Sequence, residues 1–231
     1  MNGLRILFLL IILSALPVFL VGIWFRASKY PLGPRWFLLS LLSGVISLFP
    51  AALLQSFFSR QDGVLLGSLL FKIFVQIALT EEAGRLLVLF ALFWLWRRRG
   101  KRPDPPAPSF WAATGLLSGL GFAVVETASY GAVNLGLALL RAFTAAPLHG
   151  ACGARVGLTA ASLKTEPVRA VLRFLSAVAL HGMYNFMILS PGLPAIFSVF
   201  IAFSALASSL LAIRSGAPPR ENSLSHRPGP E

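Results

Sequence analysis

Carboxylates and imidazoles lie within stretches of this sequence that are otherwise apolar. They belong to Glu81, Glu82, Glu126, His149 and His181. If these stretches cross a membrane, three carboxylates without partners cost roughly 8 to 10 kcal/mol. That is comparable to the whole net stability of a folded domain, so these side chains need partners, water or a function. Side chains of these types transfer protons and bind divalent metals, and we therefore expect a buried site for hydrolysis or proton transfer.

The composition indicates that these stretches do lie in a membrane. Of the 231 residues, 56% are hydrophobic and only 12% are charged. A soluble domain carries about twice that charged fraction. The apolar residues form runs of about 20, the length that crosses a hydrocarbon core of roughly 30 Å. We expect one transmembrane domain over residues 1–213, followed by a disordered cytoplasmic tail over 214–231 that is rich in Pro, Gly and Ser.

The apolar runs predict an all-α, polytopic transmembrane helix bundle of about seven spans. The expected spans are residues 4–25, 36–58, 78–96, 110–133, 136–163, 170–189 and 193–213. A single helix over 63–96 would be about 51 Å long, too long for one span. We therefore expect an additional interfacial or re-entrant piece before residue 78. The first span is interpreted as an anchor, because it is long for a signal peptide and lacks a small-x-small cleavage site.

Basic residues lie mainly between the apolar runs, and the net charge is +12. They concentrate at residues 26–35, 97–102, 164–173 and 214–227. Seven spans place all four segments on one side, which the positive-inside rule makes cytoplasmic, with the N-terminus outside. We expect a multi-pass protein of the cell membrane, specifically a bacterial cytoplasmic membrane. The lipid bilayer is then the partner of the basic loops, and nucleic acid is not an expected partner.

The acids and histidines are expected to share one depth in the bilayer. Counted at about 1.5 Å per residue from the cytoplasmic end of each helix, they and Asn185 lie roughly 17 to 24 Å up. Four different helices thus bring polar side chains to one layer in the external half of the membrane. Independent scatter would not produce such a layer, so we expect a shared site.

Helical spacing indicates which side chains support this site. Arg85 lies four residues after Glu81 and three after Glu82, so it can reach either carboxylate. The two glutamates diverge by about 100° around the helix axis and cannot perform the same task. Asn185 follows the second histidine by one turn, and Phe122 precedes the third glutamate by one turn. We expect Arg85, Asn185 and Phe122 to act as supporting residues.

Four motifs in order along residues 79–186 resemble those of the PrsW family of intramembrane proteases. They are E-E-A-G-R at 81–85 for EExxK, F-A-V-V-E at 122–126 for FAxxE, R…P-L-H-G-A-C-G over 141–153 for R…PxHxxxG, and H-G-M-Y-N-F at 181–186 for HGxYDF. Arg85 and Asn185 stand where that family usually has Lys and Asp. These two look more like the related family of CAAX-processing proteases, which however spaces its first motif as EExxxR and has His in place of Glu126.

The resemblance implies cleavage of a membrane-anchored protein near the external face. In characterised relatives this is the first cut of an anti-sigma factor in stress signalling. We expect Glu81 to be the general base, within a catalytic set of Glu81, Glu82, Glu126, His149 and His181. Two schemes are open. His149 and His181 bind a divalent metal such as zinc together with Glu126, or they stabilise the oxyanion in a metal-free mechanism.

Two other classes of protein could use the same residues. Buried carboxylates and histidines also form proton relays, as in a proton-coupled transporter. The sequence lacks the repeated halves with paired broken helices that are typical of transporters. A non-catalytic membrane scaffold with the protease fold is the second alternative.

Overall fold

The computed structural model describes residues 3–28, 32–58, 65–99, 107–131, 135–190 and 196–215, and regular structure in them is helical throughout. The helices are α1 (Gly3–Ala27), α2 (Pro34–Ser56), α3 (Leu66–Phe71), a π-helical segment η1 (Lys72–Leu79), α4 (Thr80–Arg99), α5 (Pro108–Gly131), α6 (Leu135–Ser162), α7 (Pro167–Leu189) and α8 (Ile196–Ser215). The all-α prediction is confirmed, and the span boundaries agree within a few residues.

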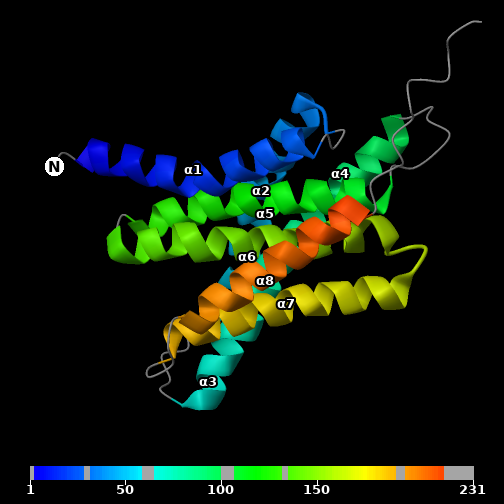
Figure 1. Cartoon of the computed structure of the whole chain (residues 1–231). Coiled ribbons are helices and arrows are strands. Elements are labelled where there is room, and N and C mark those ends of the chain that lie inside the picture. The colour runs from blue at the N-terminus through cyan, green and yellow to red at the C-terminus, as the bar shows by residue number, and fades with distance from the viewer. Residues whose placement is uncertain are drawn as a thin grey trace, which may run out of the picture.

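Four of these helices, α2, α5, α7 and α8, are long and apolar enough to cross a membrane by length and composition. The apolar described part of α1, Ile11–Ala27, is shorter. The long helices α4 and α6 carry the charged residues singled out above, which lowers their apolarity. Together with α1, the described residues form seven long helices. Figure 1 shows how they are arranged.

The chain from Leu66 to Arg99 remains helical without a connecting loop. The expected additional piece before residue 78 is present as α3 and η1, but it continues directly into α4. Eight residues of wider π-helical winding, Lys72–Leu79, join the two α-helical parts. Figure 1 shows α3 projecting beyond the bundle at one end. Helix α8 continues to Ser215, and the rest of the tail expected over 214–231 lies outside the described part of the chain.

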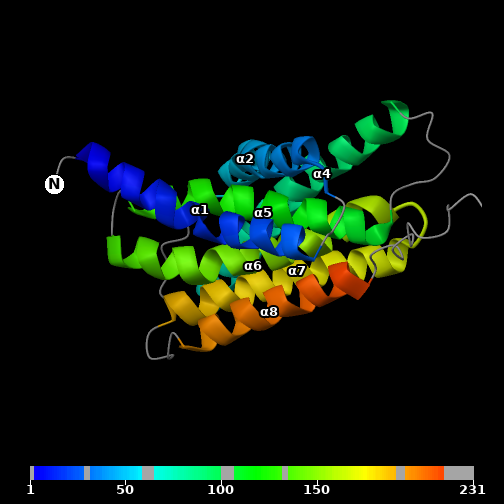
Figure 2. The same cartoon turned by 45° about the horizontal axis from the view of Figure 1, so that its top comes forward.

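Helices α5 and α6 form the centre of the bundle. Within the apolar stretch of α5 that could cross a membrane, 78% is buried, whereas the corresponding share is 28% in both α2 and α8. Helix α5 packs against α1, α2 and α6, while α6 packs against α4, α7 and α8. Figure 2 shows α5 and α6 between α1 and α2 on one side and α7 and α8 on the other.

Glycines bring the central helices into backbone contact. A Cβ added at Gly115 or Gly119 of α5 would overlap the carbonyl groups of Gly153 or His149 of α6. A Cβ at Gly153 would in turn overlap the carbonyl of Gly115. Small residues at such crossings let helices in a membrane approach closely, where packing replaces the hydrophobic effect as the driving force. This contact fixes the position of His149 beside α5.

Close contacts at glycines also position the outer helices of the site. A Cβ on Gly84 of α4 would overlap Ala51 of α2, and a Cβ on Gly182 of α7 would overlap the ring of Phe74 in η1. Gly44 of α2 lies equally close to the backbone of α5. The rotation of each helix about its axis is thereby restricted, so its polar residues face a defined neighbour.

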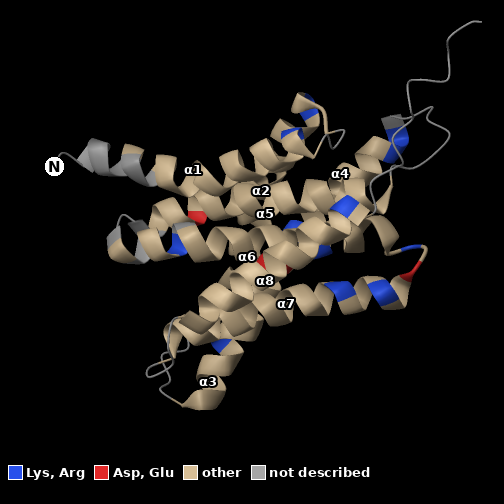
Figure 3. Ribbon diagram, viewed as in Figure 1, with Lys and Arg blue, Asp and Glu red and all other residues tan. Residues whose placement is uncertain are grey.

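Basic residues gather at one end of the bundle. Figure 3 shows them toward the end of α4, the start of α7 and the end of α8. This arrangement agrees with the expected grouping of basic segments on one side.

Candidate active site

Glu81 and Glu82 open α4 directly after η1. Their exposed fractions are 6% and 0%, so both carboxylates are buried. Segments of π-helix are rare and occur frequently at functional sites, because they change the direction in which the following side chains point. Consecutive positions diverge by about 100°, which gives the two glutamates different neighbours.

Glu82 is held by two donors. Arg85 donates from Nη1 to Glu82 Oε2. His181 Nδ1 lies 2.8 Å from Glu82 Oε1. Because a carboxylate accepts here, Nδ1 of the imidazole is the donor. Arg85, which could reach either glutamate by spacing alone, therefore pairs with Glu82.

Glu81 has looser contacts than Glu82. Gln55 Nε2, on α2, donates to Glu81 Oε1 over 3.4 Å. The second oxygen, Oε2, is buried and accepts no hydrogen bond within the described part of the chain. It lies 3.6 Å from His181 Nε2. The carboxylate of Glu81 thus faces the ring nitrogen of His181 that does not contact Glu82.

Glu126 of α5, with 14% of its side chain exposed, forms a second polar group with α6. Its Oε1 lies 2.6 Å from Arg141 Nη2, and its Oε2 lies 2.8 Å from His149 Nε2. The contact with the imidazole is short but is not aligned as a hydrogen bond. His149 Nδ1 lies 3.4 Å from Arg85 Nη2, so the histidine connects this group to the Glu82 pair.

Aromatic packing closes the site from one side. The rings of His149 and His181 meet edge to face with centroids 4.8 Å apart. Phe122 lies 5.1 Å from the His149 ring and 4.8 Å from the Arg85 guanidinium. The ring of Phe122 is 1% exposed, so it excludes lipid and water from both side chains.

The structure brings together the five expected acids and histidines, with Arg85 and Phe122 in direct contact with them. Asn185 is buried one turn after His181, but no hydrogen bond between described residues joins it to the cluster. Two residues that contact the site, Arg141 and Gln55, were not among the expected site residues. The sequence could have pointed to Arg141, because it begins the third motif. Nothing in the sequence pointed to Gln55, because it lies at the end of an ordinary apolar span.

A metal ion would fit one part of this cluster. Glu81, His149 and His181 each offer a ligand atom, and these atoms lie within 4.8 Å of one another. Ligands of a tetrahedral zinc site are about 3.3 Å apart at the usual bond lengths, close to the 3.6 Å between Glu81 and His181. Metal-binding histidines commonly donate their other ring N–H to a carboxylate, as His181 does to Glu82. The side chains at this position therefore fit a bound divalent metal ion.

The sequence had placed Glu126 in the metal-binding set. In the structure the candidate ligand group contains Glu81 instead, and Glu126 lies between Arg141 and His149. The difference arises because both oxygens of Glu126 already lie against Arg141 and His149, whereas Glu81 Oε2 lies beside His181 Nε2.

Residues 33–209, well over half of the chain, match the family model described as PrsW family intramembrane metalloprotease. The chain belongs to the PrsW family. Comparison with curated proteins and with solved structures gave no match. As a PrsW family member the protein is a multi-pass intramembrane metalloprotease, a hydrolase, which agrees with a buried group of acids and imidazoles. The family resemblance inferred from the four motifs is confirmed.

Proposed function

We propose that this PrsW family protein cleaves a membrane-anchored protein at the site formed by Glu81, His149 and His181. The observation that carries the proposal is the 3.6 Å approach of Glu81 Oε2 to His181 Nε2. Both atoms belong to buried side chains, and Glu81 Oε2 accepts no hydrogen bond within the described part of the chain. A site for hydrolysis needs such free atoms beside groups whose other contacts are fixed.

In the proposed reaction, Glu81 accepts a proton from the attacking water and delivers it to the leaving amine as the peptide C–N bond breaks. Gln55 holds the other carboxylate oxygen and so orients this base. A divalent cation bound by His149 and His181 beside Glu81 would supply Lewis acidity to the scissile carbonyl or the water. Peptide hydrolysis is complete with these roles, since no further reactant is consumed.

Glu82 and Glu126 have positioning roles in this scheme. Glu82 holds His181 through Nδ1, while Arg85 balances its charge. Glu126, held by Arg141, contacts the imidazole of His149. Each of these two carboxylates has two fixed partners, which leaves Glu81 as the acid best placed to exchange protons.

The location of the cut is proposed to be near the external face. Glu81 lies about 24 Å along α4 from Arg97, at 1.5 Å per residue. Because the basic end of the bundle is expected to be cytoplasmic, this distance puts the site in the opposite half of the bilayer. A membrane-anchored regulator such as an anti-sigma factor in stress signalling is the proposed substrate, in line with the family resemblance.

The experiment compares Glu81→Gln with wild-type protein in proteoliposomes that contain a membrane-anchored reporter substrate. Loss of the general base is expected to lower cleavage by at least about 100-fold, within the range for general bases. Glu166→Gln, which changes a half-exposed glutamate on the α6–α7 connection, is the matched control and should keep full activity. Chelator should abolish wild-type cleavage and added zinc should restore it. Equal cleavage by wild-type protein and Glu81→Gln would contradict the proposal.

A further inference from the structure

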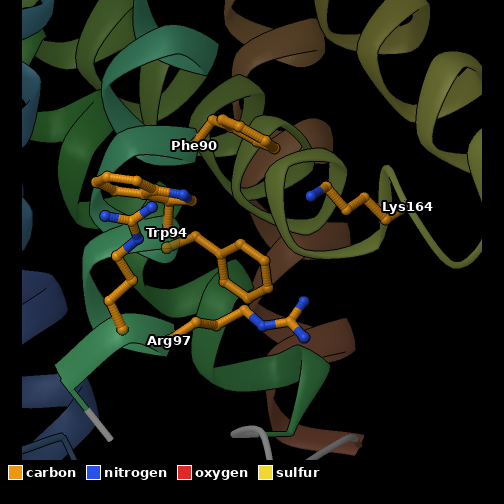
Figure 4. A pocket seen from close by; sticks show the side chains of 6 residues that line it. Phe90, Trp94, Arg97 and Lys164 are labelled. Atoms are coloured by element: carbon orange, nitrogen blue, oxygen red, sulfur yellow. The ribbon is translucent and has the colours of Figure 1, made fainter.

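A cavity of about 300 Å³ lies between the C-terminal part of α4 and the turn that connects α6 to α7. Its lining residues are all aromatic or basic: Phe90, Phe93, Trp94, Arg97, Arg98 and Lys164. In Figure 4, Arg97 and Lys164 extend toward the cavity from opposite sides. The volume is at the lower end of the range for sites that bind organic ligands. Its lining residues on α4 lie about 14 to 26 Å along the helix from Glu81, so the cavity is separate from the candidate active site.

The cations around this cavity have no acidic partner among the residues that the structure describes. None of the ion pairs in this part of the chain includes Arg97, Arg98 or Lys164. The nearest glutamate in sequence, Glu166, instead lies 3.4 Å from Arg169. Three cations that share one concave surface produce a local excess of positive charge, which favours an anionic ligand.

The wall of the cavity changes from apolar to cationic along α4. Phe90, Trp94 and Arg97 follow one another at i, i+4 and i+7, so they lie on one helix face over about 10 Å. The guanidinium of Arg98 lies 3.7 Å over the Trp94 ring, and Trp94 is 42% exposed. Trp, Arg and Lys side chains in this order are typical of the level where acyl chains meet headgroups.

We propose that this cavity binds the phosphate headgroup of an anionic phospholipid. The phosphate lies between Arg97 and Lys164, and the acyl chains run along the exposed face of α4, where Leu87 and Leu95 are 57% and 44% exposed. Inorganic phosphate shares the anionic group but has no part that contacts the apolar half of the wall. The bound lipid joins α4 to the α6–α7 turn at the basic end of the bundle, where Figure 3 shows further basic residues on α7 and α8.

The test uses the purified full-length chain in detergent micelles and counts bound lipids by native mass spectrometry. Phosphatidylglycerol is the anionic probe, phosphatidylcholine is the zwitterionic comparison without net charge, and inorganic phosphate is added as a competitor. The pocket variant is Arg97→Gln/Lys164→Gln. The matched control, Arg26→Gln/Arg214→Gln, removes the same charge from exposed positions at the same end of the bundle. The charge-conserving variant Arg97→Lys/Lys164→Arg guards against loss of binding through altered folding.

Phosphatidylglycerol is expected to bind the wild type, the control and the charge-conserving variant alike. The pocket variant should bind it about 30-fold more weakly, since each basic residue near anionic lipid contributes roughly a factor of five. Equal binding by the pocket variant and the control would overturn the proposal. The proposal would also be overturned if the wild-type protein retained phosphatidylcholine as well as it retains phosphatidylglycerol. Full displacement of the lipid by millimolar inorganic phosphate would show that the site takes the free anion, which also overturns it.

Discussion

Replacing Glu82 by Gln removes a negative charge from a fully buried ion pair while keeping the shape of the side chain. The side chains of Glu82 and Arg85 are both 0% exposed. Removing one partner of a buried pair costs about 3–5 kcal/mol, because the remaining charge has neither water nor a counter-ion. Glu82 also accepts from His181 Nδ1 at 2.8 Å, and an amide has only one oxygen for two donors. We expect Glu82→Gln to lose about 4 kcal/mol, a large part of the roughly 5–15 kcal/mol that stabilises a typical domain.

The double variant Glu82→Gln/Arg85→Met separates the effect of charge from the effect of packing. With both charges removed, no uncompensated ion remains, and such replacements are often neutral or stabilising. Arg85 also contacts His149 Nδ1 at 3.4 Å and the Phe122 ring, so part of the loss should persist. We expect the double variant to be more stable than Glu82→Gln alone by about 2 kcal/mol, a clear departure from additivity.

Stability is measured by thermal or denaturant unfolding in detergent micelles, followed by circular dichroism. Glu166→Gln is the control, because its ion pairs with Arg169 and Arg173 lie at the surface and should contribute less than about 1 kcal/mol. The reasoning is refuted if Glu82→Gln unfolds like the wild type. It is also refuted if the double variant loses the sum of the two single losses.

Two further changes test the base and the helix packing. Gln55→Leu removes the hydrogen bond to Glu81 Oε1 and should lower kcat about fivefold with little change in KM, since one long hydrogen bond contributes about 1 kcal/mol. Wild-type kcat in steady-state cleavage assays of this variant would contradict the role of Gln55. Gly119→Leu forces α5 away from the His149 carbonyl and should lower the free energy of unfolding by at least about 3 kcal/mol. Gly67→Leu, with open space around it, is the control and should be nearly neutral in the same unfolding assay. Similar stabilities of the two variants would argue against the close crossing of α5 and α6.

Much of the fold could be predicted because helices in a membrane are determined locally. Each backbone group in hydrocarbon must bond within its own segment, so a long apolar run becomes a helix wherever it packs. The run before Glu81 was harder. Its length suggested two separate pieces, whereas the chain winds through η1 as one helix. A change from α- to π-winding leaves the apolar pattern unchanged, and composition cannot reveal it.

Which residues form the site could be predicted in part from their spacing in the sequence. Acids and histidines stood out against apolar neighbours, and i, i+3 and i, i+4 offsets placed Arg85 near two glutamates. Gln55 could not be identified in this way, because nothing in the sequence says that the end of α2 faces the start of α4. The same holds for Arg97 and Lys164, which are 67 positions apart and meet across a cavity.

The sequence by itself determined which residues are helical, which helix ends are basic and which side chains are too polar for lipid. The tertiary structure alone decided that Arg85 pairs with Glu82, that Glu81 turns toward the histidines, and that Glu126 is held by Arg141. The physical reason is helix rotation. Hydropathy fixes the depth of a residue, but the direction in which it points depends on backbone contacts at glycines of neighbouring helices.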